Sequence, residues 1–314
     1  MKQSNFSRHI ENFAAFNAAL GQGLLAKINH DFLETGKAFL AFRREEATIY
    51  YHGNQLCNLV ETQNFDPTVY DRYLPLCRSK VLESKKAKNF SEREWLDDTK
   101  IAGKTFTEIL PEICDNIEKD SSPESTQASR FYHFSPLNRA QNSPLILLDV
   151  EAAFTESDEK NRIDLVFYHI NDQRLVFVEV KRLHDTRWGN KNCLDTAQVI
   201  GQMKRYRDLL KANEGTITTQ YNKAIEYYNA LSGRQMLPIG DEKPILGLLL
   251  VEHSETEADL EKIENIRHAL AKEGFGVGNI GNTESILKDK EKDPEKPSRS
   301  LQKIYNKLKK YPIN

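Results

Sequence analysis

The stretch RIDLVFYHINDQRLVFVEVKRL, residues 162 to 183, decides the fold of this chain. It contains two β-rich runs joined by an Asn-Asp pair, which is typical of a tight hairpin. The second run is apolar on both faces until Glu179, and such a run belongs in the middle of a sheet. Because side chains alternate along a strand, Glu179 and Lys181 point to the same side. An unpaired charge there costs on the order of several kcal/mol. Both residues therefore need partners, and Asp164 on the adjacent strand is the obvious third member.

A helix is expected to follow, from about Asp195 to Ala212. At about 100° per residue, Gln198, Gln202 and Tyr206 fall within one arc of this helix. An apolar stripe lies beside that arc and consists of Val199, Met203 and Leu210. The spacing therefore predicts a helix that packs on the sheet and carries polar side chains at the border of its packed face.

The flanking segments predict an α/β fold. Residues 145–154 and 244–253 have the texture of buried strands, and the leucines and isoleucines within 256–272 have helical spacing. Residues 274–281 are interpreted as a final strand or loop. Strands, a helix and a further strand form an order in which the last strand can join the same sheet.

The front of the chain shows no recognisable chemistry. Residues 9–34 predict one amphipathic helix, or two broken at Gly21 to Gly23, and residues 38–62 predict two or three antiparallel strands. Capping boxes at Ser91 with Glu94, and at Thr105 with Glu108, predict two helices.

Loops and linkers are predicted in the middle and at the end of the chain. Pro111 should kink or restart the second capped helix. The polar residues 121–129 are interpreted as a loop and a candidate boundary. Residues 288–300 are interpreted as a charged linker, and the last residues as a basic amphipathic tail with a solvated end.

Composition excludes several classes of protein. The chain has 314 residues, 39% of them hydrophobic and 29% charged, which is typical of a globular protein. We expect a cytoplasmic protein without a membrane span, since the longest apolar run, residues 245–251, falls far short of the roughly 20 residues that cross a bilayer. The net charge of -2 excludes binding of nucleic acid through bulk charge, although residues 181–211 carry eight basic and three acidic residues, a local excess of +5.

Two interpretations of the acidic residues are open. An ion-pair cluster of Asp164, Glu179 and Lys181 at the end of a hairpin is the structural one. The chemical one is a metal site, because two carboxylates and the backbone carbonyl of Val180 are the hard oxygen ligands that Mg²⁺ prefers. A metal there would activate water and neutralise developing charge, with Lys181 orienting that water, and the expected reaction is hydrolysis of a phosphodiester.

The arrangement D-x14-E-x-K resembles the PD-(D/E)xK nuclease superfamily, and Gln202 to Tyr206 looks like the Q-x3-Y motif of its RecB-type branch. The resemblance covers roughly residues 90 to 255. It implies a restriction-endonuclease-like α-β-β-β-α-β core with a mixed sheet, here beside an N-terminal α+β part. It also implies a Mg²⁺-dependent (or Mn²⁺-dependent) deoxyribonuclease in a restriction, repair or defence context. Asp164 and Glu179 would bind the metal, Lys181 would be catalytic, and Gln202 and Tyr206 would support them.

Members of this superfamily often carry a further acid upstream. Glu108 is our choice, with Glu112 and Glu151 as alternatives. Related nucleases with an iron-sulfur cluster place three cysteines close together near the C-terminus. The four cysteines here are widely spaced, so we expect no cluster and free thiols.

Basic side chains of the central stretch are candidates for DNA contacts, because phosphate contacts supply affinity that does not depend on sequence. These candidates are Arg182, Arg187, Lys204, Arg205 and Arg207. In addition, Trp188 could stack on a base or pack against the sheet edge.

We therefore expect an N-terminal region (1–89), a nuclease domain (90–287) and a linker with a tail (288–314). The N-terminal region could bind a partner protein or form a homodimer. Two rival functions remain open: a catalytically silent module that binds nucleic acid or a partner, and a nuclease that acts on RNA.

Overall fold

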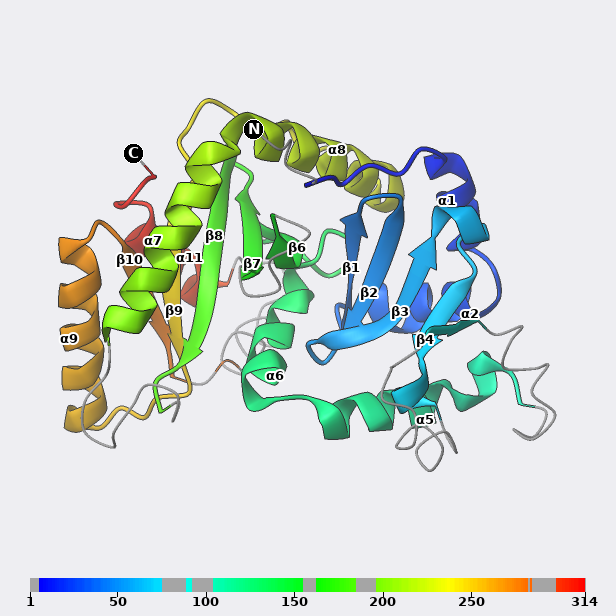
Figure 1. The fold of residues 1–314 in the computed structure, drawn as a ribbon, viewed down its shortest axis with the longest axis horizontal. Coiled ribbons are helices and arrows are strands. Elements are labelled where there is room, and N and C mark those ends of the chain that lie inside the picture. Colours follow the sequence, from blue (N-terminus) through cyan, green and yellow to red (C-terminus); the bar gives the residue numbers. More distant parts are fainter. Residues whose placement is uncertain are drawn as a thin grey trace. The chain divides into compact units, whose positions relative to one another are not determined.

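A computed structural model describes residues 6–74, 89–91, 104–154, 162–184, 196–281, 283 and 298–313. The chain divides into two compact units, each built around its own sheet (Figure 1). The mixed-sheet unit comprises Met1–Phe6, Ala140–Asn229 and Arg234–Asn314, and the meander unit comprises Ser7–Arg139 and Ala230–Gly233. The chain is thus a mixed α/β protein.

The mixed-sheet unit contains five strands in the order β10-β9-β8-β7-β6. The first three strands along the chain pair antiparallel, whereas β8, β9 and β10 run parallel to one another. The parallel pairing of β8 and β9 requires a long crossover, which the helices between them supply. The strands are β6 (Leu145–Ala153), β7 (Arg162–His169), β8 (Arg174–Arg182), β9 (Ile245–Val251) and β10 (Gly276–Ile280).

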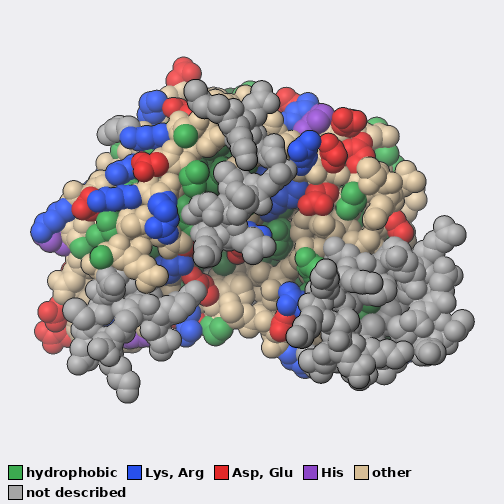
Figure 2. Space-filling view, in the orientation of Figure 1, with side chains coloured by type: hydrophobic (Ala, Val, Ile, Leu, Met, Phe, Trp, Pro, Cys, Tyr) green, Lys and Arg blue, Asp and Glu red, His purple; other side chains and the backbone are tan. Residues whose placement is uncertain are grey.

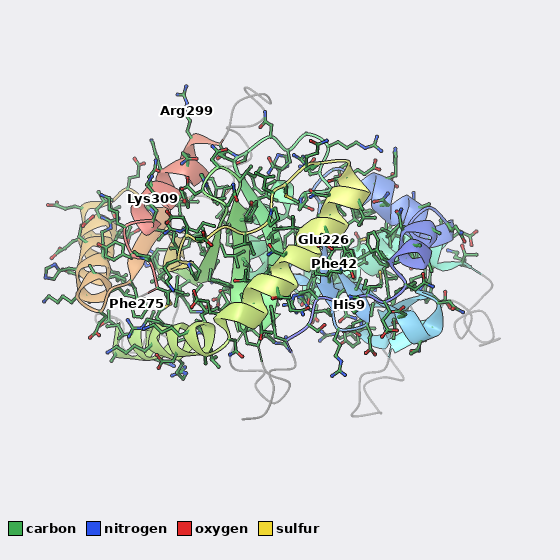
Figure 3. The ribbon with its side chains drawn as sticks, turned by 90° about the horizontal axis from the view of Figure 1, so that it is seen from above. His9, Phe42, Glu226, Phe275, Arg299 and Lys309 are labelled. Carbon is green, nitrogen blue, oxygen red and sulfur yellow. The ribbon has the colours of Figure 1, made fainter. Side chains whose placement is uncertain are left out.

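Helices cover both faces of this sheet. Seen from above, the sheet lies between α7 and α8 on one side and α11 on the other (Figure 3). Side chains alternate along β8, so each face of the strand contacts a different set of helices. Phe177 and Glu179 face α7 and α8, whereas Val178 lies on the opposite face, next to Gly247. The helices are α7 (Thr196–Ala212), α8 (Glu214–Ser232), α9 (Glu257–Lys272) and α11 (Arg299–Leu308).

The C-terminal helix α11 is part of the core, which corrects the expectation of a solvated tail. Its N-cap is Ser298, and its apolar side is buried against β9 and β10. A Cβ built on Gly247 would lie 2.6 Å from Leu308, and one on Gly278 would lie 2.8 Å from Ile304. These glycines therefore make room for the helix. The buried residues of α11 are Leu301, Ile304, Tyr305 and Leu308.

Helix α8 was not predicted from the sequence. It carries buried tyrosines, of which Tyr221 donates a hydrogen bond to the buried Asp149 at 3.0 Å. Tyr228 donates another to the carbonyl of Leu148, where the register of β6 against β7 shifts. These contacts satisfy the polar groups that the irregular part of β6 would otherwise leave buried and unpaired.

The meander unit contains a sheet in the order β1-β2-β3-β4-β5, with every pairing antiparallel. Its first helices break around Gly21 to Gly23, and a tight turn at His52 and Gly53, both with positive φ, joins the second and third strands. Both features confirm the sequence interpretation. The elements are α1 (Phe13–Ala19), α2 (Gly23–Ile28), the π-helical turn Asn29–Leu33, β1 (Ala38–Arg43), β2 (Glu46–Tyr51), β3 (Asn54–Val60), β4 (Pro67–Tyr70) and β5 (Asn89–Ser91).

Two helices of the meander unit refine the predictions for residues 105–129. The capping box of Thr105 and Glu108 is present, and α5 (Phe106–Asp120) continues through Pro111 because its apolar side is buried on both sides of the proline. The predicted loop at 121–129 is wrong, since it contains α6 (Pro123–Ser129). Ser122 as N-cap and Pro123 at the first helical position are start signals that the polar composition obscured.

Three sequence predictions concern residues outside the described ones: the helix expected after Ser91, the charged linker up to residue 297, and Cys77 with Cys193. The two described cysteines, Cys57 and Cys114, are buried free thiols. Within the described part of the chain, no helix is both long enough and apolar enough to cross a membrane.

The packing of α11 predicts that Leu308→Ala destabilises the protein by about 2 to 5 kcal/mol, since the side chain is fully buried and its removal leaves a cavity. Urea denaturation followed by circular dichroism measures the effect. Leu260→Ala is the matched control, because Leu260 lies on helix α9 and is 46% exposed. It should change stability by less than about 0.5 kcal/mol. Equal losses in the two variants would contradict the assignment of α11 to the core.

Candidate functional site: a buried acid pair at the fork of β7 and β8

Asp164 and Glu179 lie where strands β7 and β8 separate. Pairing between the strands ends at Leu165 and Val178, one position before the two acids would face each other. The backbone N–H of Val180 donates to Asp164 Oδ2 at 2.7 Å. The carboxylate thus replaces a strand partner for this amide, as a buried backbone donor requires. The hairpin brings the two acids together as predicted.

Glu179 is the most deeply buried charged group of the site, with 2% of its side chain exposed. Its Oε1 receives two contacts, from Lys181 Nζ at 2.6 Å and from Gln202 Nε2 at 2.8 Å. Its Oε2 is also buried, and no hydrogen-bond donor lies beside it among the described residues. This oxygen can be satisfied by carrying a proton that it donates to Asp164, by accepting from a water molecule, or by binding a cation.

Helix α7 holds Glu179 through a chain of hydrogen bonds. Gln202 Nε2 also donates to the hydroxyl of Tyr206 at 2.7 Å, and this hydroxyl donates to the backbone carbonyl of Arg162 at 2.5 Å. Tyr206 is fully buried together with Met203 in the apolar side of the helix. Packing of α7 therefore fixes the amide of Gln202 against Glu179 and ties the helix to the start of β7.

Burial and neighbouring charges shift the pKa values of these three groups. Desolvation, followed by the charge of Asp164, raises the pKa of Glu179. Desolvation also raises the pKa of Asp164, partly offset by attraction to Lys181 and reinforced by Glu151. Burial alone would lower the pKa of Lys181, but attraction to the two acids outweighs it and the pKa is raised. The lysine is therefore charged at neutral pH, and the acid pair readily holds a proton.

The donor set of the site suits a hard divalent cation. Asp164 and Glu179 supply carboxylate oxygens, and Mg²⁺ commonly takes one or two carboxylates and keeps several waters. The unsatisfied Oε2 of Glu179 is the observation that fits a cation. Among the described residues, no group of three or more His, Cys, Asp or Glu side chains is arranged to hold a metal. A cation bound here would therefore need ligands beyond the two acids, such as the carbonyl of Val180 and water.

Glu151, and not Glu108, belongs to the unit that contains the site. Glu108 belongs to the meander unit, where its carboxylate accepts hydrogen bonds from the N–H and hydroxyl of Thr105 and so caps its own helix. Glu151 lies on β6 at the register position across from Asp164, between the pairs Val150–Leu165 and Ala152–Ile163. Its charge contributes to the raised pKa of Asp164. The backbone of Glu151 is left-handed, with φ of +48°, which is unusual for a residue other than glycine.

Basic residues predicted to contact DNA are largely occupied by other contacts. Arg182 pairs with Glu252, and Lys204 pairs with Glu273 at 2.7 Å. Arg207 donates to the carbonyl of Glu273 at 3.0 Å and lies over the ring of Phe275, which Figure 3 labels.

Arg205 is exposed on α7, over which Lys and Arg side chains gather in Figure 2. Arg187 and Trp188 are outside the described residues.

Arg162 was missed by the sequence reasoning, although it opens the same motif. It precedes Asp164 by two residues, and this spacing alone places both side chains on one face of β7.

No family model matches this chain, and searches of curated proteins and of solved structures find no significant match to it. The geometry of the site therefore carries the functional argument.

The raised pKa of Glu179 makes a prediction about stability without metal. The pKa of Glu179 is raised from its ordinary value of 4.5 to about 8. Between these two pH values the folded protein retains a proton on Glu179 that the unfolded chain releases. The free energy of unfolding should therefore fall as pH rises from about 5 to 8, and Glu179→Gln should remove about 1 kcal/mol or more of this fall. Urea denaturation in EDTA at both pH values measures it. Glu261→Gln, at an exposed position of α9, should keep the wild-type dependence. An unchanged dependence in Glu179→Gln would contradict the assignment.

Proposed function

We propose that this protein is a divalent-cation-dependent nuclease of the PD-(D/E)xK superfamily, RecB-type branch, which hydrolyses phosphodiester bonds in DNA. One observation carries the proposal. Asp164, Glu179 and Lys181 meet Gln202 and Tyr206 at one point, where a buried oxygen of Glu179 has no hydrogen-bond donor among the described residues and can accept a cation. In a purely structural ion pair both carboxylate oxygens would be expected to have partners, since burying an incompletely paired carboxylate is costly.

The order of the elements supports the same proposal. Strands β6, β7 and β8 form an antiparallel meander, helices α7 and α8 follow, and β9 returns parallel to β8. With α8 as an additional helix, this order matches the β-β-β-α-β part of the arrangement implied by the resemblance. The expected preceding helix would be α5, which belongs to the meander unit.

The proposed roles follow from the chemistry of each side chain. Asp164, Glu179 and the carbonyl of Val180 would hold Mg²⁺ or Mn²⁺, which supplies Lewis acidity and an activated water when bound. Lys181 is charged, so it acts as a cation that orients the attacking water and stabilises negative charge on the phosphate, not as a proton acceptor. Gln202 and Tyr206 position Glu179 from helix α7.

The proposal predicts cleavage of DNA that requires Mg²⁺ or Mn²⁺ and stops with EDTA. Lys181→Ala should lower the rate by about 100-fold or more, because it removes a charge aimed at the reacting phosphate. Asp164→Asn, which keeps the shape of the side chain, should have a similar effect. Gel assays with matched DNA and RNA strands measure cleavage. Lys243→Ala is the control, since it removes a lysine from an exposed ion pair with Glu214. Wild-type cleavage by both site variants would refute the proposal, and cleavage of RNA alone would support the rival substrate.

Binding of Mn²⁺ provides a test that does not depend on catalysis. Calorimetric titration of the wild-type protein should show uptake of Mn²⁺, and Asp164→Asn should weaken it by at least about tenfold because a carboxylate ligand is lost. Glu261→Gln should bind Mn²⁺ like the wild type. Salt-dependent binding of DNA without any uptake of Mn²⁺ would instead identify a catalytically silent module.

A further inference from the structure

Arg162 lies at the border between solvent and the acid pair of half-buried Asp164 and buried Glu179. It is the first residue of β7, and its side chain is 46% exposed whereas that of Glu179 is 2% exposed. Side chains two residues apart share a face of a strand, so Arg162 accompanies Asp164 on the face that bears the site. A group that approaches the acid pair along this face from solvent would meet the guanidinium of Arg162.

The backbone of Arg162 is fixed to the site. Its carbonyl accepts the hydrogen bond of Tyr206, whose hydroxyl also accepts from Gln202. Gln202 in turn contacts Glu179. The position of Arg162 relative to the acid pair is therefore set by the same network that orients Glu179, while its side chain extends toward solvent.

The guanidinium of Arg162 forms a long ion pair with Glu151. Arg162 Nη1 lies 3.9 Å from Glu151 Oε2, at the limit of an ion pair, and the side chain of Glu151 is 36% exposed. Pairs of this kind contribute little to stability, roughly 0 to 1 kcal/mol. Redirecting the guanidinium to another anion would therefore cost little. By contrast, Lys181 and Arg182 are closely paired with Glu179 and Glu252.

We propose that Arg162 binds a backbone phosphate of the nucleic-acid substrate beside the acid pair, and that Glu151 holds the guanidinium in position until the phosphate replaces it. This inference rests on the proposed nuclease function and adds a substrate-binding residue to it. A guanidinium suits the task because its planar fork can donate two parallel hydrogen bonds to phosphate oxygens. A polyanionic substrate must also approach the two acids, and a cation beside them offsets that repulsion.

The left-handed backbone of Glu151 supports a functional role for this residue, in addition to its place in strand β6. A residue other than glycine at φ of +48° is strained, and strained positions are concentrated at functional sites. A glycine would adopt this conformation without strain, so the acidic side chain at position 151 is not what the backbone geometry favours.

Binding of fluorescent single-stranded and duplex DNA tests the inference. Anisotropy is measured with Ca²⁺ in place of Mg²⁺, so that binding is followed separately from cleavage. Arg162→Ala keeps the backbone carbonyl that Tyr206 needs. It should weaken binding about tenfold and reduce the slope of log affinity against log salt by about one, as expected for loss of one phosphate contact. Arg162→Lys should recover part of the affinity, because it restores the charge without the fork.

Two further variants make the comparison specific. Lys243→Ala removes one positive charge from an exposed pair on the loop before β9, and it should bind like the wild type. Glu151→Gln should bind DNA more tightly, and this gain should be smaller when Arg162 is already Ala. Wild-type cleavage together with unchanged affinity and salt slope in Arg162→Ala would overturn this inference alone. A wild-type protein that neither binds nor cleaves nucleic acid would overturn the proposed function and this inference with it.

Discussion

Burial of the Glu179 carboxylate is the constraint on which the site depends. A charge placed at 2% exposure in the centre of a sheet must be matched, and here Lys181 and Gln202 match one of its oxygens. The other oxygen is left to a proton, a water molecule or a cation. Helix α7 has to pack on the sheet with one rotation and one position along its axis to place Gln202 against Glu179. The hydroxyl of Tyr206 secures that packing by its bond to the start of β7.

The acid pair itself does not stabilise the fold. Burial raises the pKa of both carboxyls, and keeping charged groups away from solvent in this way costs free energy. Stability has to come from elsewhere in the unit, where α7 and α8 cover one face of the sheet and α11 covers the other. Close packing of α11 depends on glycines in β9 and β10, such as Gly247, whose missing side chains admit Leu308. Packing of the helices on the sheet thus offsets the free-energy cost of the acid pair.

Some basic side chains of this protein are held in structural contacts, and others extend into solvent. The central stretch has a local excess of +5, yet Arg182 pairs with Glu252 and Arg207 joins α7 to the residues after α9. A count of basic residues therefore overstates the charge available to a polyanion. Arg162 differs because its partner is distant and exposed and its backbone belongs to the acid network.

The sequence by itself determined the features that local periodicity controls. Alternation along β8 placed Glu179 and Lys181 together, the hairpin brought Asp164 beside them, and helical spacing aligned Gln202 with Tyr206. Only the tertiary structure decided which distant segments complete this arrangement. Glu151 became the neighbouring acid through the register of β6 against β7, while Glu108 capped its own helix. Helix α11 entered the core because glycines on other strands admit it. These outcomes depend on contacts between residues far apart in the chain, which a local pattern does not encode.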